Sequence, residues 1–487
     1  MYMLIVVDHP KSWPLHLEGV EVVQARKYIT EEAFTRITEA RVFNLCRSYR
    51  YQSTGYYVSL LAAARGHKPI PDVSTIRDLQ THTTVRLVSE QLDELIDRSL
   101  HDHKGDKFTL SIYFGQNLAR RYDRLSLELF NLFRAPLLRA TFGKIKNQWT
   151  LQSVGPIAIS DVPETHHTFL VKVAHEFFAG RHRRVRRRQQ PVYSMAILLN
   201  ETDPHPPSNP RAIEAFIHAA EKIGIDAETI NRDDFSRLPE YDALFIRETT
   251  SVTNHTFRFA RRAEAEGLVV MDDPASILRC TNKVYLEELM KRHRVPTPRT
   301  VIVHRDNLDL LPYEIGLPLI LKQPDSSYSV GVVKIQTKAE LETIGRRMLE
   351  DSELLIAQEF LPTDFDWRIG MIDGKPFYGA RYYMAKKHWQ IVQRDDEKVH
   401  EGKVEAIPLA RIPDRVLNLA SRAARPIGDG LYGIDLKQSG QRTVVIEIND
   451  NPSLDAGYED QILKHRLYET VMKSFLRRIK ARKRFRS

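Results

Sequence analysis

The chain has 487 residues, of which 42% are hydrophobic and 28% charged, as is typical of a globular protein of about two to four compact units. No apolar run approaches the about 20 residues that a membrane-spanning helix needs, and residues 4–7 are too few for a signal peptide. We therefore expect no membrane partner. The two cysteines, Cys46 and Cys280, are far apart, which argues against disulfides or a cysteine zinc site and predicts a cytoplasmic location.

The net charge of +9 favours anionic partners, and much of it lies in two runs, residues 181–188 and 477–484. Two interpretations remain open. The runs are a solvated linker and a frayed chain end, or they dock an acidic macromolecule. The first run leads into Gln189-Gln190-Pro191 and cannot bury an apolar face, so we predict a linker over residues 181–191.

The region before this linker, residues 1–180, is predicted to be a mixed α/β domain of unassigned task. Residues 3–7, 20–23 and 108–114 have the pattern of strands, and residues 125–138 have the apolar spacing of a helix.

A group of four tyrosines stands out in this region: Tyr49, Tyr51, Tyr56 and Tyr57. The group could form the wall of a ligand site. Aromatic residues at this density more often belong to a hydrophobic core, so we favour the core.

After the linker the pattern alternates regularly between strand and helix. Asn209-Pro210 provides a helix cap followed by a proline at the first helical position. A second helical pattern covers residues 257–266. The predicted strands are residues 193–199, 243–246 and 268–271. This order predicts a small parallel sheet within a domain of residues 192–278.

Near the C-terminus, residues 444–449 alternate as a strand. One predicted face holds Val444, Ile446 and Ile448, and the other holds Val445, Glu447 and Asn449. Glu447 and Asn449 would then lie about 7 Å apart along the strand. A second strand, residues 431–437, carries Asp435, and a loop with an odd number of residues would place Asp435 on the face of Glu447.

The oxygen donors of Asp435, Glu447 and Asn449 suit magnesium that keeps some of its water for phosphate ligands. The alternative is a surface hairpin with incidental carboxylates. The apolar residues of the other face favour burial, and buried acids without a cation are costly, so we predict a metal site.

Two lysines are candidates for binding an anion. Lys283 begins a predicted helix of residues 283–291, where a lysine is usually solvent-exposed. Lys322 ends an apolar strand of residues 318–322, where a buried charge needs an anionic partner such as phosphate.

The segment Glu447-Ile448-Asn449-Asp450-Asn451-Pro452 resembles the closing motif of ATP-grasp ligases. It is most similar to that of the RimK-like branch, which adds glutamate to peptides and proteins. The resemblance extends over about residues 192–475 through the order of the motifs. It implies a two-lobed ATP-grasp domain at residues 279–476, followed by a basic tail at 477–487. Residues 1–180 resemble the N-terminal domain found fused to RimK-like proteins.

The resemblance also implies roles for single residues. Lys283 and Lys322 would hold the ATP phosphates, and Asp435, Glu447 and Asn449 would bind magnesium or manganese, as two ions. The loop over the triphosphate would contribute Ser326, Ser327, Ser329 and Gly331, with serines where relatives usually carry glycine. Glu359 and Phe360 would read the adenine edge, Asp366 the ribose, and Arg368 and Arg381 would stabilise the reacting phosphoryl group.

The sequence thus predicts an ATP-dependent carboxylate–amine ligase that forms an amide or peptide bond through an acylphosphate. Its partners would be an amino-acid substrate and an acidic peptide or protein acceptor. One alternative is a ligase of small molecules, of the glutathione or dipeptide type. Another is a nucleotide-regulated protein that binds RNA or the ribosome. Because no aromatic RNP strand is present, we expect no nucleic-acid partner.

Overall fold

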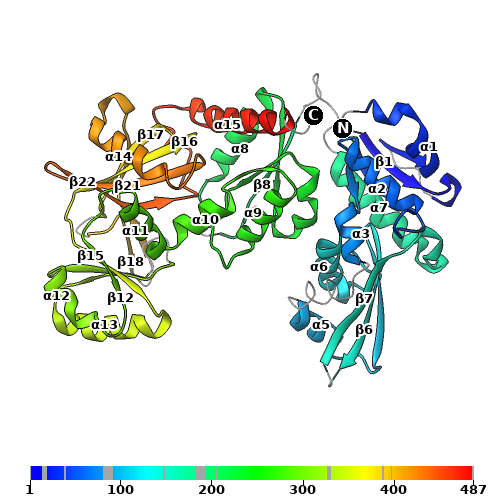
Figure 1. Ribbon diagram of the computed structural model, residues 1–487, viewed down its shortest axis with the longest axis horizontal. Helices are drawn as coiled ribbons and strands as arrows, with labels where there is room; N and C mark the ends of the chain where they lie inside the picture. The colour runs from blue at the N-terminus through cyan, green and yellow to red at the C-terminus, as the bar shows by residue number, and fades with distance from the viewer. Residues whose placement is uncertain are drawn as a thin grey trace. The chain divides into compact units, whose positions relative to one another are not determined.

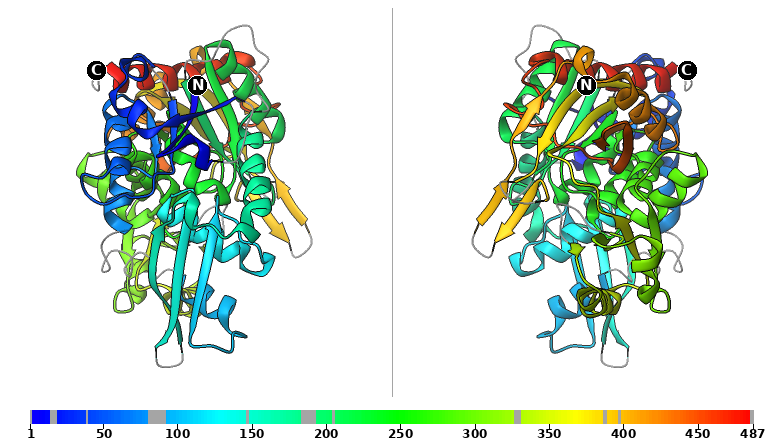
Figure 2. Two further views of the ribbon diagram at one scale, coloured as in Figure 1. Left: turned by 90° about the vertical axis from the view of Figure 1, so that its right-hand side faces the viewer. Right: turned by 90° about the vertical axis from the view of Figure 1, so that its left-hand side faces the viewer.

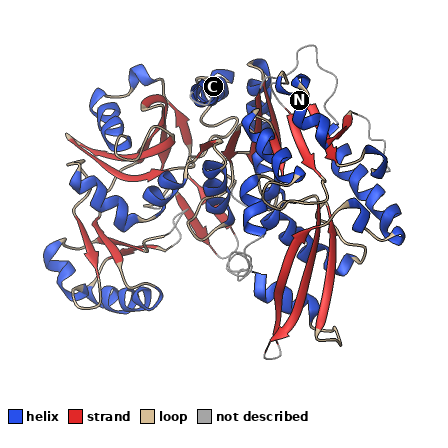
Figure 3. Cartoon of the chain, turned by 45° about the vertical axis from the view of Figure 1, so that its right-hand side comes forward, coloured by secondary structure: helices blue, strands red, loops and turns tan. Residues whose placement is uncertain are grey.

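The computed structural model describes residues 2–13, 19–37, 40–79, 92–145, 148–182, 193–203, 206–325, 331–385, 389–395 and 398–484. The chain divides into unit 1, Met1–Gln189 with Asp233–Glu240, and unit 2, Gln190–Arg232 with Tyr241–Ser487. Sheets and helices alternate in both units (Figure 3), which confirms the predicted mixed α/β fold. The finer domain boundaries remain predictions. Among the described helices, none is both long and apolar enough to span a bilayer.

Unit 1 begins with a parallel sheet in the order β2-β1-β3-β4. The strands are β1 (Tyr2–Val7), β2 (Val20–Gln24), β3 (Ala40–Asn44) and β4 (Lys68–Ile70). The helices of this part are α1 (Ala25–Thr30), α2 (Thr54–Ala64) and α3 (Val73–Leu79). The two predicted strands at residues 3–7 and 20–23 are confirmed as β1 and β2. All of β3 is buried, as expected for a strand covered on both faces.

The rest of unit 1 contains an antiparallel sheet of β5 (Lys107–Tyr113), β6 (Leu137–Ile145) and β7 (Gln148–Pro156). Figure 2 shows the long strands β6 and β7 side by side. The helices are α5 (Asp93–Leu100), α6 (Asp123–Phe133) and α7 (His167–His182). The prediction of one helix over residues 125–138 is wrong at its end, because Pro136 cannot continue a helix and β6 begins directly after it.

Unit 2 begins with a parallel sheet in the order β11-β10-β8-β9 (Figure 1). Its strands are β8 (Tyr193–Leu198), β9 (Ile225–Ile230), β10 (Ala243–Ile246) and β11 (Val269–Met271). Its helices are α8 (Pro210–Lys222), α9 (His255–Ala265) and α10 (Pro274–Thr281). Asn209 caps α8 by accepting a hydrogen bond from the Ala212 N–H, as the sequence predicted. The edge strand β9 was not predicted, because its exposed residues interrupt the apolar run.

Two antiparallel sheets follow in unit 2. The first, in the order β12-β15-β13-β14, contains β12 (Thr300–Val303), β13 (Leu319–Lys322), β14 (Val332–Ile335) and β15 (Leu355–Glu359). Its helices are α12 (Leu311–Glu314) and α13 (Lys338–Asp351). The second, in the order β20-β17-β16-β21-β22, contains β16 (Phe365–Ile372), β17 (Lys375–Tyr383), β20 (Val404–Ala406), β21 (Leu431–Ser439) and β22 (Arg442–Asn449).

Helices α11 (Lys283–Arg292) and α14 (Asp414–Ala424) pack with this second sheet in one hydrophobic core (Figure 1). A two-stranded sheet of β18 (Val392–Asp395) and β19 (Lys398–Glu401) completes the strands described in unit 2. The predicted hairpin turn at Asp373-Gly374 is confirmed, with φ of 53° and 71° at the two residues.

The basic residues near the C-terminus belong to helix α15 (His465–Arg484). The interpretation of residues 477–484 as a frayed chain end is therefore wrong, although Arg477 and Lys480 are exposed to solvent. Phe475 of α15 contacts Phe245 of β10, with 5.3 Å between the ring centroids. Arg478 forms ion pairs with Asp373 at 2.9 Å and Asp429 at 3.0 Å. Helix α15 thus ties the parallel sheet of unit 2 to the turn between β16 and β17. The predicted basic linker, from residue 183 to 191, lies outside the described residues.

The Arg478 contacts predict a measurable loss of stability. Arg478→Ala should lower the free energy of unfolding of unit 2 by about 1–3 kcal/mol, because two partly buried, charge-assisted interactions are lost. Arg466→Ala, at an exposed position on the same helix, is the matched control. Urea unfolding followed by circular dichroism measures both variants. Equal stabilities would show that α15 is not held by these ion pairs.

Candidate active site

The hairpin of β21 and β22 closes with a two-residue loop, Gly440-Gln441, between the paired residues Ser439 and Arg442. The prediction of an odd-numbered loop is therefore wrong. The pairing skips Ile446, so the register shifts between Asp435 and Leu436. This β-bulge supplies the extra residue that the loop lacks, and Asp435 pairs directly with Glu447, as the sequence analysis required.

The bulge also changes which face of β22 each side chain occupies. Val445 and Ile448 are buried in the same hydrophobic core, although strict alternation predicted opposite faces for them. Ile446 instead lines a cavity together with Glu447. The predicted alternation over residues 444–449 is thus wrong. One extra residue in a strand moves the side chains that precede it to the opposite face of the sheet.

Arg368 of β16 pairs in register with Asp435 and binds both carboxylate oxygens. The Nη2 atom donates to Oδ2 at 2.8 Å, and Nε donates to Oδ1. Asn449 Nδ2 donates to the same Oδ2 at 3.2 Å. Asp435 raises the pKa of Arg368 well above its ordinary value, although burial acts in the opposite direction. Arg368 therefore stays charged and joins Asp435 and Asn449 in one buried group.

The residues predicted to bind metal supply donors that suit magnesium. Asp435 and Glu447 offer carboxylates from neighbouring strands, and Asn449 offers an amide oxygen. Within the described ranges, no three His, Cys, Asp or Glu side chains gather in a way that could hold a metal ion. The third protein donor would therefore be the amide of Asn449, with the remaining positions filled by water or phosphate.

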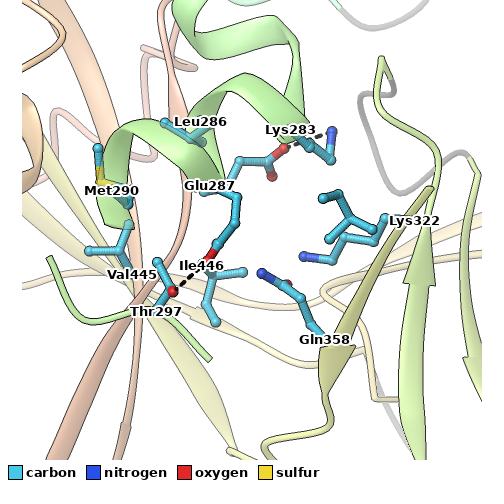
Figure 4. Close-up of a pocket in the computed structure, with 11 residues that line it drawn as sticks. Lys283, Leu286, Glu287, Met290, Thr297, Lys322, Gln358, Val445 and Ile446 are labelled. Atoms are coloured by element: carbon cyan, nitrogen blue, oxygen red, sulfur yellow. Dashed lines mark hydrogen bonds and ion pairs between the residues drawn. The ribbon is translucent and has the colours of Figure 1, made fainter. Parts of the chain in front are cut away.

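Lys283, Lys322 and Glu447 come together on the cavity that Figure 4 shows. Lys283 Nζ lies 3.2 Å from Glu447 Oε1. Burial would raise the pKa of Glu447, but Lys283 and Lys322 outweigh burial and lower it. The pKa of Lys322 is lowered to about 8, mainly by burial; Lys283 and Lys437 act in the same direction, and Glu447 acts in the opposite direction. The ammonium groups of Lys283, Lys322 and Lys437 thus outnumber the carboxylates of Glu447 and Asp366, so the site can bind an added anion.

The loop predicted to close over phosphate is anchored at both ends. Asn282 Nδ2 donates to Asp325 at 2.8 Å, and the Lys283 N–H donates to the Pro324 carbonyl at 2.9 Å. The Gln323 N–H donates to the carbonyl of Gly331, which has a φ of 69°. The predicted loop residues Ser326, Ser327 and Ser329 lie outside the described residues.

Of the predicted adenine-reading residues, Glu359 ends β15 and Phe360 follows it. The Glu359 carboxylate accepts hydrogen bonds from Arg442 and from the Arg299 N–H, the latter at 2.7 Å. Arg442 lowers the pKa of Glu359. The Phe360 ring lies 3.7 Å from Lys334 Nζ. The Glu359 side chain is thus occupied by protein partners, and its backbone N–H donates to the Arg299 carbonyl at 2.9 Å.

Asp366, the predicted ribose ligand, is buried and has a partner that the sequence analysis missed. Lys437 Nζ donates to Asp366 at 2.6 Å and to Thr363 at 2.7 Å. Lys437 follows Asp435 by two residues on β21, so both side chains lie on one face of that strand. The alternation of side chains along a strand could therefore have identified Lys437 from the sequence.

Arg381 is not brought to this group. Arg381 pairs in register with Trp367 of β16, whereas the next residue of β16, Arg368, pairs with Asp435 of β21. Successive residues of β16 face opposite sides of the sheet, so Arg381 lies on the Trp367 side. Its guanidinium carbon is 4.7 Å from the Phe365 ring centroid and 4.9 Å from that of Trp367. The predicted catalytic role of Arg381 is therefore corrected to a contact with aromatic rings.

The cavity has apolar walls and polar groups at its edge (Figure 4). Its apolar lining comes from Leu286, Met290, Ile356, Val445 and Ile446. Glu287 and Gln358, which the sequence analysis did not select, also line it. Glu287 accepts a hydrogen bond from Thr297 at 3.2 Å, and burial raises the pKa of Glu287. Since Glu287 follows Lys283 by one helical turn, the helix period could have identified it.

Arg247 was also missed, and it holds the segment that follows the metal-site residues. The side chain is fully buried (0% exposed) at the end of β10. It donates to Asn451 Oδ1 at 2.6 Å, to the Pro452 carbonyl at 2.8 Å and to Ser208 Oγ at 3.0 Å. These bonds fix residues 451–452 to the parallel sheet of unit 2.

The packing of Arg368 predicts a sensitive position at Gly433. A Cβ atom there would lie 2.8 Å from Pro452 Cβ and 3.0 Å from Arg368 Cδ. Gly433→Ala should therefore displace Arg368 and destabilise the protein by about 1–3 kcal/mol. Gly155→Ala is the control, because nothing lies within 4 Å of its Cβ. Thermal melts compare the two variants. A Gly433→Ala protein as stable as the control would refute the close packing.

The chain matches two known families. Residues 25–173 match the RimK-like ATP-grasp N-terminal domain, and residues 280–464 match the RimK-like ATP-grasp domain. The second match includes the candidate residues from Lys283 to Asn449. The first match lies within unit 1, where the sequence predicted a domain of this kind.

The relatives found by sequence are similar over less than half of the chain. A probable alpha-L-glutamate ligase of Vibrio vulnificus is 27% identical over 222 residues, which are 45% of this chain and 71% of that one. A protein of the same name from Shewanella loihica is 27% identical over 221 residues, again 45% and 71% of the two chains. The structure of a RimK domain ATP-grasp protein from Sphaerobacter thermophilus covers 58% of this chain and 98% of its own, with 16% identity and a TM-score of 0.45. The predicted class, an ATP-grasp ligase, is confirmed, and the predicted resemblance to RimK-like ATP-grasp proteins is confirmed over residues 25–173 and 280–464.

Proposed function

We propose that this protein is an ATP- and magnesium-dependent ligase that joins the carboxylate of one substrate to the amine of another. The observation that carries the proposal is the convergence of Lys283, Lys322 and Arg368 with two carboxylates in one buried site. Positively charged groups held in a site of low dielectric bind phosphate strongly and need no reorganisation during the reaction.

Magnesium held by Asp435, Glu447 and Asn449 would offset the negative charge of the ATP phosphates. Lys283 and Lys322 would bind the phosphate oxygens from the side of α11 and β13. Because Arg368 is fixed by Asp435, it would meet the negative charge that develops when a carboxylate attacks the γ-phosphorus. The resulting acylphosphate would then be attacked by the amine, which releases phosphate and leaves an amide bond.

The cavity beside Lys322 has the mixed lining of a base-binding site. Its apolar side chains favour a purine ring, and Glu287, Thr297 and Gln358 offer hydrogen-bonding partners. We infer that the adenine lies here, with Asp366 and Lys437 toward the ribose.

The substrates are inferred from the relatives. Proteins named probable alpha-L-glutamate ligase are 27% identical to this chain over 222 residues, so we propose glutamate or a similar amino acid as one substrate. An acidic peptide or protein is proposed as the acceptor, in keeping with the net charge of +9. The two buried free cysteines support a cytoplasmic location.

Glu447→Gln should reduce ATP turnover by at least about a hundredfold, since the change removes a carboxylate from the proposed magnesium site. The fold should persist, because the amide keeps the shape of the side chain. Glu342→Gln, on the exposed face of α13, is the control. ADP release with magnesium, glutamate and a panel of acceptors measures turnover, and mass spectrometry identifies the product. Full activity of the Glu447→Gln variant would overturn the site assignment.

The pKa of Lys322, about 8, predicts a pH dependence of nucleotide binding. Below pH 8 the ammonium is charged and binds phosphate, and above it the neutral amine does not. The dissociation constant for ATP should therefore rise by up to about tenfold for each pH unit above 8. Lys322→Arg, which stays charged, should remove this dependence. Calorimetric titration with ATP measures it, and a flat profile for the unaltered protein would contradict the role of Lys322.

A further inference from the structure

The exposed tyrosines of unit 1 form a surface that the proposed reaction does not use. We define the tyrosine–arginine surface as Arg47, Arg50, Tyr51, Tyr56 and Tyr57. Tyr51 is 62% exposed and Tyr57 is 38% exposed. Of the four tyrosines expected in a core, Tyr49 alone is buried there. The core interpretation is therefore wrong for Tyr51 and Tyr57, and Tyr56 is partly buried.

Arg47, Arg50 and Tyr51 lie on a loop that is held by hydrogen bonds although it has no regular structure, and Tyr56 and Tyr57 lie in the first turn of α2. The Ser48 carbonyl accepts hydrogen bonds from Ser53 Oγ at 2.8 Å and from the Gly55 N–H at 3.2 Å. A Cβ atom on Gly55 would lie 2.5 Å from that carbonyl, so only glycine allows the loop to approach α2 so closely. The Tyr49 hydroxyl donates to the Asn44 carbonyl at 2.6 Å. The exposed side chains thus project from a preorganised base.

The loop also lies where parallel sheets usually bind their ligands. In the order β2-β1-β3-β4, the connections leave in opposite directions from β1 and β3, and ligands bind at the carboxyl ends of such strands. Asp8 follows β1 and accepts a hydrogen bond from the Arg47 N–H at 2.6 Å. This bond joins the ends of the two strands and leaves the Arg47 side chain exposed.

The side chains on this surface have the chemistry of a protein-binding site. Tyr51 and Tyr56 have ring centroids 5.1 Å apart, and Tyr56 and Tyr57 have centroids 5.7 Å apart. Tyrosine and arginine are enriched among the residues that dominate binding energy at interfaces. Within the described part of the chain, no ion pair engages the guanidinium of Arg47 or Arg50. Two exposed guanidiniums without carboxylate partners favour an acidic ligand.

We propose that the tyrosine–arginine surface binds an acidic peptide segment and so recruits the acceptor of the ligase reaction. The inference rests on the proposed function for the identity of that peptide as acceptor. A peptide is favoured over single-stranded nucleic acid because the rings meet edge to face, at 64° and 74°, and so do not present parallel faces for successive bases. Carboxylates of the peptide would pair with Arg47 and Arg50, and its aliphatic stems would pack on the tyrosines.

Binding of fluorescein-labelled hexaglutamate to the full chain, followed by fluorescence anisotropy at low salt without ATP, tests the proposal. Unaltered protein should bind hexaglutamate and not hexaglutamine. The double variants Arg47→Glu/Arg50→Glu and Tyr51→Ser/Tyr57→Ser should each raise the dissociation constant by about tenfold or more. The control is Arg26→Glu/Lys27→Glu, which reverses two exposed charges on α1 of the same unit. Circular dichroism melts verify that all variants are folded.

Three outcomes would overturn the inference. These are no binding of hexaglutamate, equal binding by the surface variants and the control, and tighter binding of labelled oligouridine lost in the same variants. ADP release with glutamate and a small amine acceptor is measured in parallel. If that reaction proceeds while the surface variants still bind peptide normally, the surface inference alone fails. If peptide binding depends on the surface but ADP is not formed with any acceptor, the proposed function fails instead.

Discussion

The arrangement of charges in unit 2 depends on two carboxylates placed side by side across β21 and β22, of which Asp435 is buried and Glu447 partly buried. Asp435 and Glu447 repel each other, and burial makes both charges costly unless cations compensate them. Arg368 compensates Asp435, while Lys283 and Lys322 compensate Glu447. These cations come from β16, α11 and β13. Compensation of the two carboxylates therefore brings side chains from both antiparallel sheets of unit 2 and from α11 together in one site. The same balance leaves the site suited to ATP and a divalent cation, whose charges are opposite in sign.

Holding that arrangement depends on contacts outside the site. Arg247 fixes residues 451–452 to the end of β10, and Arg478 fixes α15 to the turn between β16 and β17. Each of these arginines donates hydrogen bonds to several acceptors at once, because its planar guanidinium group carries several N–H donors. The parallel sheet of unit 2 thereby becomes a support for the strand end that carries Glu447 and Asn449.

The two units use the same strand order for different purposes. Both parallel sheets place the first strand between the second and the third, so both have a point where the connections diverge. In unit 2 that point is filled by the fully buried Arg247. In unit 1 the corresponding point carries a braced loop with exposed tyrosines and arginines. The same topology thus supports an internal anchor in one unit and an exposed surface in the other.

The sequence by itself determined the elements with a strong period and the order of the charged residues along the chain. It predicted β10 to its last residue, the cap of α8, the turn at Asp373-Gly374 and the lysine at the end of β13. These features depend on local chemistry, which nearby residues define. Only the tertiary structure decided which face each side chain occupies, because a single skipped residue at Ile446 reverses the alternation before it and brings Asp435 opposite Glu447 despite an even loop. It likewise separated Arg381 from Arg368 and paired Lys437 with Asp366, since cross-strand register is set by neighbours that are distant in the chain.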